Sequence, residues 1–151
     1  MIETAIMCLA LNIYFEARDQ PINGQIAVAE VTLNRVTSKE HPNTICGVVK
    51  QSSSKGCAFS WYCDGQSDIP REKIAFERSK RLSEFMIDNH KYISVVGEKA
   101  TYYHNDTVNP YWAKGFHKLK KVGDHTFYSR YFWLKKPMAK PKIIDEIDKN
   151  L

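Results

Sequence analysis

The sequence predicts a helix-dominated α+β fold in a single domain. Helical periodicity fills the first 36 residues and returns between about residues 71 and 90, whereas short apolar and aromatic segments alternate with turn residues beyond residue 91. A chain of 151 residues is long enough to form one compact core. Its contents of 43% hydrophobic and 26% charged residues are ordinary for a folded globular protein.

The first predicted helix covers the apolar segment from Ala5 to Phe15. Its core face is indicated by residues at alternating steps of four and three: Ile2, Ile6, Leu9 and Ile13. The next position on the same face is Glu16, where the apolar segment ends. A carboxyl group is therefore expected at the edge of an apolar surface.

A second helix is predicted after Pro21, whose ring suits the start of a helix. Its apolar surface is wide enough for the helix to be nearly buried all round, along a stripe of Ile22, Ile26, Ala29, Leu33 and Val36. Glu30 lies in the middle of this helix, where an unpaired carboxylate would be costly. It is either a functional partner or, as we favour, part of a satisfied polar strip with Asn34 and Arg35.

The remaining chain predicts loops, a third helix and a β-hairpin. Residues 38–70 are rich in Ser, Gly, Asn, Asp and Pro and predict ordered loops. A helix is expected from about residue 71 to residue 90, with one side formed by Ile74, Arg78, Leu82, Phe85 and Met86. Gly123-Asp124, between apolar segments, predicts a hairpin turn. The folded domain is expected to comprise residues 1–134, followed by a basic tail at residues 135–151.

Charge and cysteine content limit the class of protein less strongly than the helical pattern limits the fold. The formal net charge of +5 fits either attraction to a polyanion or a solubility feature. The sequence has no apolar run long enough to span a bilayer and no secretory signal at its N-terminus, so we expect no membrane insertion. The cysteines are expected to be reduced thiols, although Cys57 and Cys63 are near enough in sequence to bridge in an oxidising compartment. Neither cysteines nor histidines show metal-ligand spacing, and we expect no metal and no cofactor.

Glu16 is the leading candidate for acid–base chemistry. Burial disfavours the charged form of a carboxyl group, so a glutamate beside an apolar pocket can keep its proton and donate it to a leaving oxygen, as the general acid of a glycosidase does. The alternative is a side chain that faces solvent or pairs with Arg18. Aromatic residues mixed with polar ones could stack on sugar rings, although each is individually more typical of a core: Phe59, Trp61, Tyr62, Tyr102, Tyr103, Tyr111 and Trp112.

Several short motifs occur in a fixed order. They are ALNIYFEAR at residues 10–18, GQIAVAEVTLNRV at 24–36, PNTICGVV at 42–49, FSW at 59–61, ATYYHN at 100–105 and PYW at 110–112. In this order the motifs resemble the SleB-like, spore-cortex-lytic family of cell wall hydrolases, whose domain also occurs in phage endolysins. The resemblance extends from about Thr4 to Tyr128 and implies a fold like the catalytic core of lysozymes and lytic transglycosylases.

The resemblance also implies a substrate and site residues. By position, Glu16 matches the catalytic glutamate of the family, and Phe59, Ser60, Trp61, Tyr103 and Asn105 are the candidates for binding the glycan. The expected activity is cleavage of the MurNAc–GlcNAc linkage of peptidoglycan by the domain at residues 1–134. We favour a lytic transglycosylase because the family motif offers one glutamate, whereas a hydrolytic muramidase ordinarily uses a second carboxylate.

Two readings from other classes remain as alternatives. A non-catalytic peptidoglycan-binding module could use the same groove, and a nucleic-acid-binding protein would explain the basic charge. Neither is favoured, because the E-A-R motif is intact and the positive charges are dispersed without a recognisable binding motif. We expect a monomer, made in the cytoplasm of a host or bacterial cell, that acts on the cell wall after release.

Overall fold

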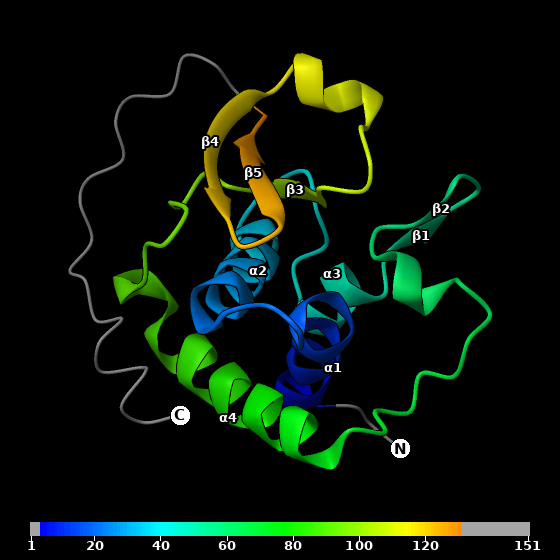
Figure 1. Ribbon diagram of the computed structural model, residues 1–151. Helices are drawn as coiled ribbons and strands as arrows, with labels where there is room; N and C mark the ends of the chain where they lie inside the picture. Colours follow the sequence, from blue (N-terminus) through cyan, green and yellow to red (C-terminus); the bar gives the residue numbers. More distant parts are fainter. Residues whose placement is uncertain (1–3, 131–151) are drawn as a thin grey trace.

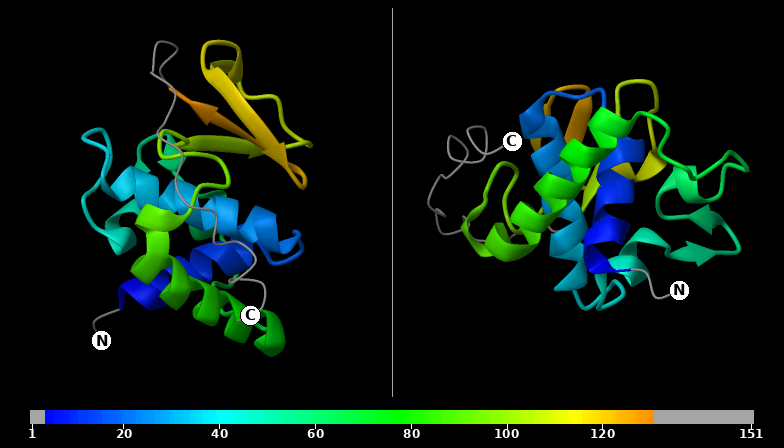
Figure 2. Two further views of the ribbon diagram at one scale, coloured as in Figure 1. Left: turned by 90° about the vertical axis from the view of Figure 1, so that its left-hand side faces the viewer. Right: turned by 90° about the horizontal axis from the view of Figure 1, so that it is seen from below.

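The computed structural model describes residues 4–130, so Ile2 and the tail at residues 135–151 lie outside the described residues. The helices are α1 (Ala5–Ala17), α2 (Ile22–Val36), α3 (Ile45–Val49) and α4 (Lys73–Asn89); the strands are β1 (Ser52–Ser53), β2 (Gly56–Cys57), β3 (Tyr102–Asn105), β4 (His117–Val122) and β5 (His125–Ser129). Short 3-10 helices occur at Ser60–Tyr62, His90–Tyr92 and Tyr111–Lys114. The helices form one layer and the three longer strands cover one side of it (Figures 1 and 2). The predicted helix-dominated α+β fold is thus confirmed.

The helical layer is built around α1 and α2. Thr4 caps α1 by accepting a hydrogen bond from the backbone N–H of Met7 at 3.1 Å. The predicted face of α1 is correct, since Leu9 and Ile13 are fully buried, and α2 is buried on nearly all sides. α1 packs against α2, α3 and α4, which places its C-terminal end beneath the sheet (Figure 1).

Two details of the helical layer differ from the prediction. The buried side of α4 consists of Ser79, Leu82, Ser83 and Met86, whereas Ile74 is 80% exposed near the start of the helix, beyond the reach of the core. α3 lies in the region predicted as loops, where Thr44 accepts a hydrogen bond from the backbone N–H of Gly47 at 3.0 Å and starts a helix of one turn. Such a short helix carries too little periodicity to be recognised.

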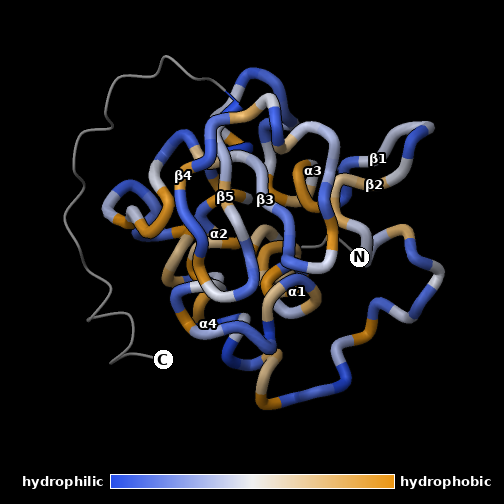
Figure 3. The backbone as a smooth tube through the Cα atoms, turned by 45° about the horizontal axis from the view of Figure 1, so that its top comes forward, coloured by the Kyte–Doolittle hydropathy of each residue, from blue (hydrophilic) through white to orange (hydrophobic). Residues whose placement is uncertain are grey.

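The three-stranded sheet is antiparallel with the order β3-β5-β4. β5 is central and buried throughout, whereas β4 is an edge strand rich in lysine, visible as a hydrophilic tube in Figure 3. The predicted hairpin is β4–β5, and Gly123 in its turn has a φ of +57°, a left-handed conformation that favours glycine. In the register of the sheet, Tyr103 of β3 lies opposite Phe127 of β5.

The expectation of reduced cysteines is wrong for this structure. Cys8 of α1 and Cys46 of α3 form a disulfide with their Cα atoms 5.3 Å apart, because the two helices pack side by side. Cys57 and Cys63, six positions apart in the sequence, form a second disulfide with a Cα–Cα distance of 5.8 Å. The first of these pairings could not be read from a sequence separation of 38 residues.

No helix among residues 4–130 combines the length and the apolar character required to cross a membrane.

Candidate active site

Glu16 lies in the last turn of α1 and meets the sheet at Tyr103. The Tyr103 hydroxyl donates a short hydrogen bond to Oε1 of Glu16. Tyr103 reaches this position because the ring, on β3, also packs against Phe127, with 5.4 Å between ring centroids, and against the edge of His125 at 5.0 Å. The alternative in which Glu16 pairs with Arg18 is not observed, since the Arg18 guanidinium binds Glu72 and the Tyr14 carbonyl instead.

The environment of Glu16 favours its protonated form. Burial raises the pKa of the Glu16 carboxyl above its ordinary value of 4.5, and the hydrogen bond from Tyr103 and the positive charge of Arg35 oppose this rise. The pKa of Tyr103 is raised well above 10, chiefly by burial and then by the nearby Glu16, so its hydroxyl remains a hydrogen-bond donor. Glu16 therefore has the properties of a general acid: a proton held by burial and a fixed donor beside it.

Arg35 is the buried cation of the site and was not predicted as a functional residue. It comes from α2, its Nε donates to the Thr101 carbonyl at 2.7 Å, and its guanidinium lies over the rings of Phe59 and Tyr102 at 5.1 and 5.3 Å from their centroids. The sequence did not mark Arg35 as functional, because α2 also carries the buried polar residues Gln25, Glu30 and Asn34.

Two hollows are lined by members of the Glu16–Tyr103 pair. The first, which we call the acidic hollow, has a volume of about 730 Å³ and is lined by Phe15, Glu16, Arg18, Asp19, Gln20, Glu72, Ala75, Asn105, Asp106, Thr107, Asp124 and His125. The second, the aromatic hollow, has a volume of about 600 Å³, and its lining includes Arg35, His41, Gln51, Tyr102, Tyr103, Tyr111 and Trp112. Glu16 lines the first hollow and its hydrogen-bond partner Tyr103 lines the second, so the pair contributes to both.

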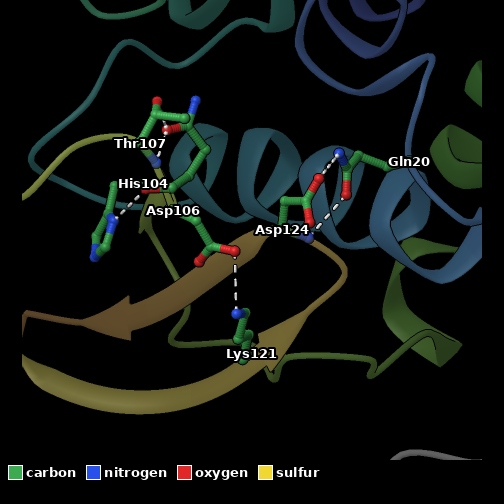
Figure 4. Close-up of polar contacts among 7 residues, drawn as sticks. Gln20, His104, Asp106, Thr107, Lys121 and Asp124 are labelled. Atoms are coloured by element: carbon green, nitrogen blue, oxygen red, sulfur yellow. Dashed lines mark hydrogen bonds and ion pairs between the residues drawn. The ribbon is translucent and has the colours of Figure 1, made fainter.

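The rim of the acidic hollow is held by polar contacts between the sheet and the turn after α1 (Figure 4). Lys121 of β4 pairs with Asp106 at 3.1 Å, and Asn105 accepts hydrogen bonds from the backbone N–H and hydroxyl of Thr107. On the other side Gln20 binds Asp124. These contacts fix the loop at residues 105–107 and the β4–β5 turn on either side of the hollow.

The structure brings together three of the six predicted site residues. Glu16, Tyr103 and Asn105 line the two hollows. Phe59 and Trp61 are core residues instead, with exposed fractions of 2% and 7%, and Ser60 is exposed but lines neither hollow.

The position of Trp61 has a clear physical reason. Its ring stacks on Phe15 with 4.9 Å between centroids, and its indole N–H donates to Asn12 at 2.8 Å. Asn12, itself fully buried, donates to the Thr32 hydroxyl at 3.1 Å. Trp61 therefore supports the helix that carries Glu16 and has no free face to offer a sugar ring.

Glu30 is a structural residue, as favoured from the sequence. It is fully buried, and its carboxyl oxygens accept hydrogen bonds from the backbone N–H groups of Val95 and Val96 at 2.9 Å and of Gly97 at 3.2 Å. Its partners thus come from the loop between α4 and β3, whereas Asn34, one turn further along α2, donates to the carbonyls of Gly97 and Ala100. Together they fasten this loop to α2 ahead of Tyr103.

Within residues 4–130, no group of three or more His, Cys, Asp or Glu side chains is arranged to hold a metal ion.

A carboxyl group at the end of a buried helix, with a pKa raised by burial and an exposure to a hollow, has the features of the general acid in enzymes that cleave glycosidic bonds. The comparison with known proteins agrees with this class. The chain belongs to the Cell Wall Hydrolase family, because the sequence model of that family matches residues 19–128.

Relatives of known function are similar over most of the chain. Spore cortex-lytic enzymes of Bacillus cereus and Bacillus subtilis (strain 168) are 33% identical over 122 residues and 34% identical over 127 residues, in each case covering 81% of this chain. The matches cover 43% and 36% of the respective relatives, so the chain spans less than half of their length.

Two solved structures share the fold. The catalytic domain of the germination-specific lytic transglycosylase SleB from Bacillus anthracis superimposes with a TM-score of 0.67 at 34% identity, covering 85% of this chain and 97% of that domain. The catalytic domain of the Bacillus cereus SleB protein gives a TM-score of 0.62 at 32% identity, covering 85% and 93% of the two chains. The fold expected from the SleB-like motifs is therefore confirmed.

Proposed function

We propose that this chain cleaves the glycan strands of peptidoglycan at the MurNAc–GlcNAc linkage, as a lytic transglycosylase with Glu16 as general acid and then general base. The observation that carries the proposal is the hydrogen bond from Tyr103 to the Glu16 carboxyl group, whose pKa burial raises, between two residues that each line a hollow. The relation to a domain described as a lytic transglycosylase supports the same reaction.

The first step breaks the glycosidic bond. Protonated Glu16 gives its proton to the bridging oxygen, which leaves as the hydroxyl of the departing sugar while positive charge develops at C1 of the muramic acid. Glu16 becomes a carboxylate at this moment. The Tyr103 hydroxyl and the positive charge of Arg35 stabilise that carboxylate, since both favour the charged form.

The second step closes a ring in the product. The Glu16 carboxylate takes the proton from the 6-hydroxyl of the same muramic acid while that oxygen bonds to C1, which forms a 1,6-anhydro sugar and restores protonated Glu16. No water is consumed, and one carboxyl group serves both steps. Glu16 both donates the proton in the first step and recovers one in the second.

The two hollows suit a polymer that crosses the site. The aromatic hollow offers the rings of Tyr111, which is 92% exposed, and Trp112 for contact with sugar faces. The acidic hollow offers carboxylate groups and the Asn105 amide for hydroxyls and amides. Glycan units on both sides of the cleaved bond can therefore be bound at once, with Glu16 between them.

A hydrolytic muramidase is the second candidate, and one observation favours it. Asp19 lines the acidic hollow together with Glu16, and its carboxylate could activate a water molecule in place of the muramic acid hydroxyl. The two reactions give different products, because water adds to the fragment in hydrolysis and is absent from the anhydro product.

The remaining expectations belong to the proposal as well. We propose that the protein acts as a monomer on peptidoglycan strands and does not bind nucleic acid. It is made in the cytoplasm and reaches the cell wall after release, as an endolysin or a bacterial wall hydrolase does. The spread of carboxylates and aromatic rings around Glu16 suits a neutral glycan better than a nucleic acid backbone.

The test is digestion of purified peptidoglycan by the wild-type protein and by Glu16→Gln, with the fragments resolved by mass spectrometry. We expect fragments from the wild type alone, each lighter by one water than a hydrolytic product. Fragments of hydrolytic mass would establish the muramidase. Equal release by both proteins would remove Glu16 from the reaction, and binding without any release would indicate a non-catalytic peptidoglycan-binding module.

A further inference from the structure

Gln20 links the helix that carries Glu16 to the hairpin that supports Tyr103. It lies in the turn between α1 and α2, and its side chain makes two hydrogen bonds with Asp124 in the β4–β5 turn (Figure 4). Nε2 of Gln20 donates to Oδ2 of Asp124 at 3.1 Å, and the Asp124 backbone N–H donates to Oε1 of Gln20 at 2.9 Å. One amide group thus joins segments 104 residues apart in the sequence.

The position of Gln20 is itself fixed. Its backbone N–H donates to the carbonyl of Ala17, the last residue of α1, at 2.9 Å. Its carbonyl accepts a hydrogen bond from Nε2 of Gln25 in α2 at 3.0 Å. The side chain therefore extends from a backbone segment held by both helices. Its contact with the hairpin fixes the position of the hairpin relative to these helices.

The hairpin turn is seated closely against this side chain. A Cβ atom added to Gly123 would collide with Oε1 of Gln20 and would lie 3.2 Å from Cδ of Pro21. The positive φ of 57° favours glycine at position 123, and a side chain there would also have to displace the Gln20 amide. Such a tight seat leaves the turn little freedom to move relative to the end of α1.

The β4–β5 turn also determines where Tyr103 lies. His125 follows Asp124 directly, is only 5% exposed, pairs with Asn105 of β3 and presents its ring to the Tyr103 ring at 5.0 Å. A displacement of the turn would therefore move the support of Tyr103. The contacts form a closed circuit from Glu16 along α1 to Gln20, through the hairpin to Tyr103, and back to Glu16.

We propose that Gln20 is a positioning residue for the reaction, which keeps the Tyr103 hydroxyl on Glu16 by fastening the β4–β5 turn to the end of α1. This inference rests on the proposed function of Glu16. Gln20 would act through Tyr103 and would not contact the bond that is broken. Its loss should therefore change the proton affinity of Glu16 and the rate of the chemical step more than the binding of the glycan.

The pH dependence of the reaction shows whether the Tyr103 hydroxyl stays on Glu16. The charged or titratable groups that face Glu16 are Tyr103 from β3 and Arg35 from α2, and those that share its hollow are Arg18, Asp19, Glu72, Asp106, Asp124 and His125. The Tyr103 hydrogen bond lowers the pKa of Glu16, so a looser bond should raise that pKa. For Gln20→Ala we expect the loss of activity on the alkaline side to move to higher pH, kcat to fall about 10- to 100-fold and KM to change little.

Two further variants separate positioning from general destabilisation. Asn89→Ala removes a side-chain amide hydrogen bond of similar length, 2.9 Å to the Phe85 carbonyl, from α4. It should lower Tm without moving the pH profile. Gln20→Glu sets two carboxylates against each other, and adding Asp124→Asn to it restores a donor–acceptor pair, so the double variant should recover much of the lost kcat.

The outcomes distinguish this inference from the proposed function. Gln20→Ala that lowers Tm but leaves kcat and the alkaline limb as in wild type would overturn the positioning role. A raised KM with an unmoved limb would also overturn it, because Gln20 would then contact the glycan. Wild-type protein that releases no fragments would contradict the proposed function, and an NMR titration of Glu16 in wild type and Gln20→Ala would then test the positioning alone, with an unchanged pKa as the contrary result.

Discussion

Tyr103 donates a hydrogen bond to Glu16 from 87 residues further along the chain. Burial raises the pKa of both groups, so near neutral pH the phenol keeps its proton and always donates, whereas the carboxyl group is the partner whose charge can change. The same hydrogen bond orients Glu16 and limits the rise of its pKa. It therefore couples the geometry of the acid to its strength.

Replacing Tyr103 by Phe should expose this coupling. The variant keeps the ring but loses the donor, so the pKa of Glu16 rises further and the alkaline limb of the pH–rate profile moves to higher pH. We expect kcat to fall about 10- to 100-fold, since the Glu16 carboxylate also loses stabilisation after proton transfer. Tyr92→Phe, at an exposed ring, is the matched control. An unshifted alkaline limb in Tyr103→Phe would contradict the role given to the hydroxyl.

Glu16→Gln should stabilise the protein at neutral pH. Because the folded protein holds the Glu16 proton more tightly than the unfolded chain, wild-type stability from this group is complete below about pH 4.5 and is lost as the pH rises through the raised pKa. An amide does not titrate and can still accept from Tyr103. We expect the Tm of the variant to exceed that of wild type by about 2–4 °C at pH 7, with the gap closing towards pH 4. A gap that is constant with pH would contradict a raised pKa.

Glu30 should be important for stability and not for the reaction itself. Glu30→Ala leaves three backbone N–H groups in the segment from Val95 to Gly97 without their acceptor, in a buried place. The expected loss is about 3–5 kcal/mol in the free energy of unfolding, measured by urea denaturation. The comparison is Glu84→Gln, an exposed glutamate of α4, which should cost less than about 0.5 kcal/mol. Equal losses for the two variants would refute the role of the Glu30 carboxylate.

The two disulfides should contribute unequally. In the chain-entropy description, the Cys8–Cys46 bridge closes a segment of 38 residues and stabilises by about 4 kcal/mol, whereas the six-residue separation of Cys57 and Cys63 corresponds to about 2 kcal/mol. Paired substitution by Ser, with thermal unfolding in the absence of reductant, measures each bridge. A larger loss for Cys57→Ser with Cys63→Ser would reverse the expected order.

Local periodicity was sufficient to predict α1, α2 and α4 and to place Glu16 on the core face of α1. The face of α1 is defined by residues three and four apart, so the position of Glu16 on that face follows from neighbours within one or two turns. The β4–β5 turn was predictable for the same reason, because a glycine and an aspartate between apolar segments determine a hairpin locally. These features require no knowledge of distant contacts.

The partners of Glu16 could not be predicted in this way. Arg35 and Tyr103 reach it from a second helix and from a strand; Tyr103 was a candidate through the aromatic set and the family motif, and nothing marked Arg35 as functional. Trp61 is the reverse case: it was predicted to bind the glycan but lies in the core. An aromatic residue beside polar ones is compatible with either a groove or a core. Its burial depends on Asn12, 49 residues away, which accepts the indole N–H.

The separation between Glu16 and Tyr103 also has a consequence for how the protein becomes active. Glu16 leaves the ribosome well before Tyr103, and the strand that holds Tyr103 pairs with β5, at the far end of the described chain. Contacts of such long sequence separation form late and slowly in folding. A partly synthesised chain would carry the acid without its partner, so competence is expected to arise only when synthesis of the domain is nearly complete.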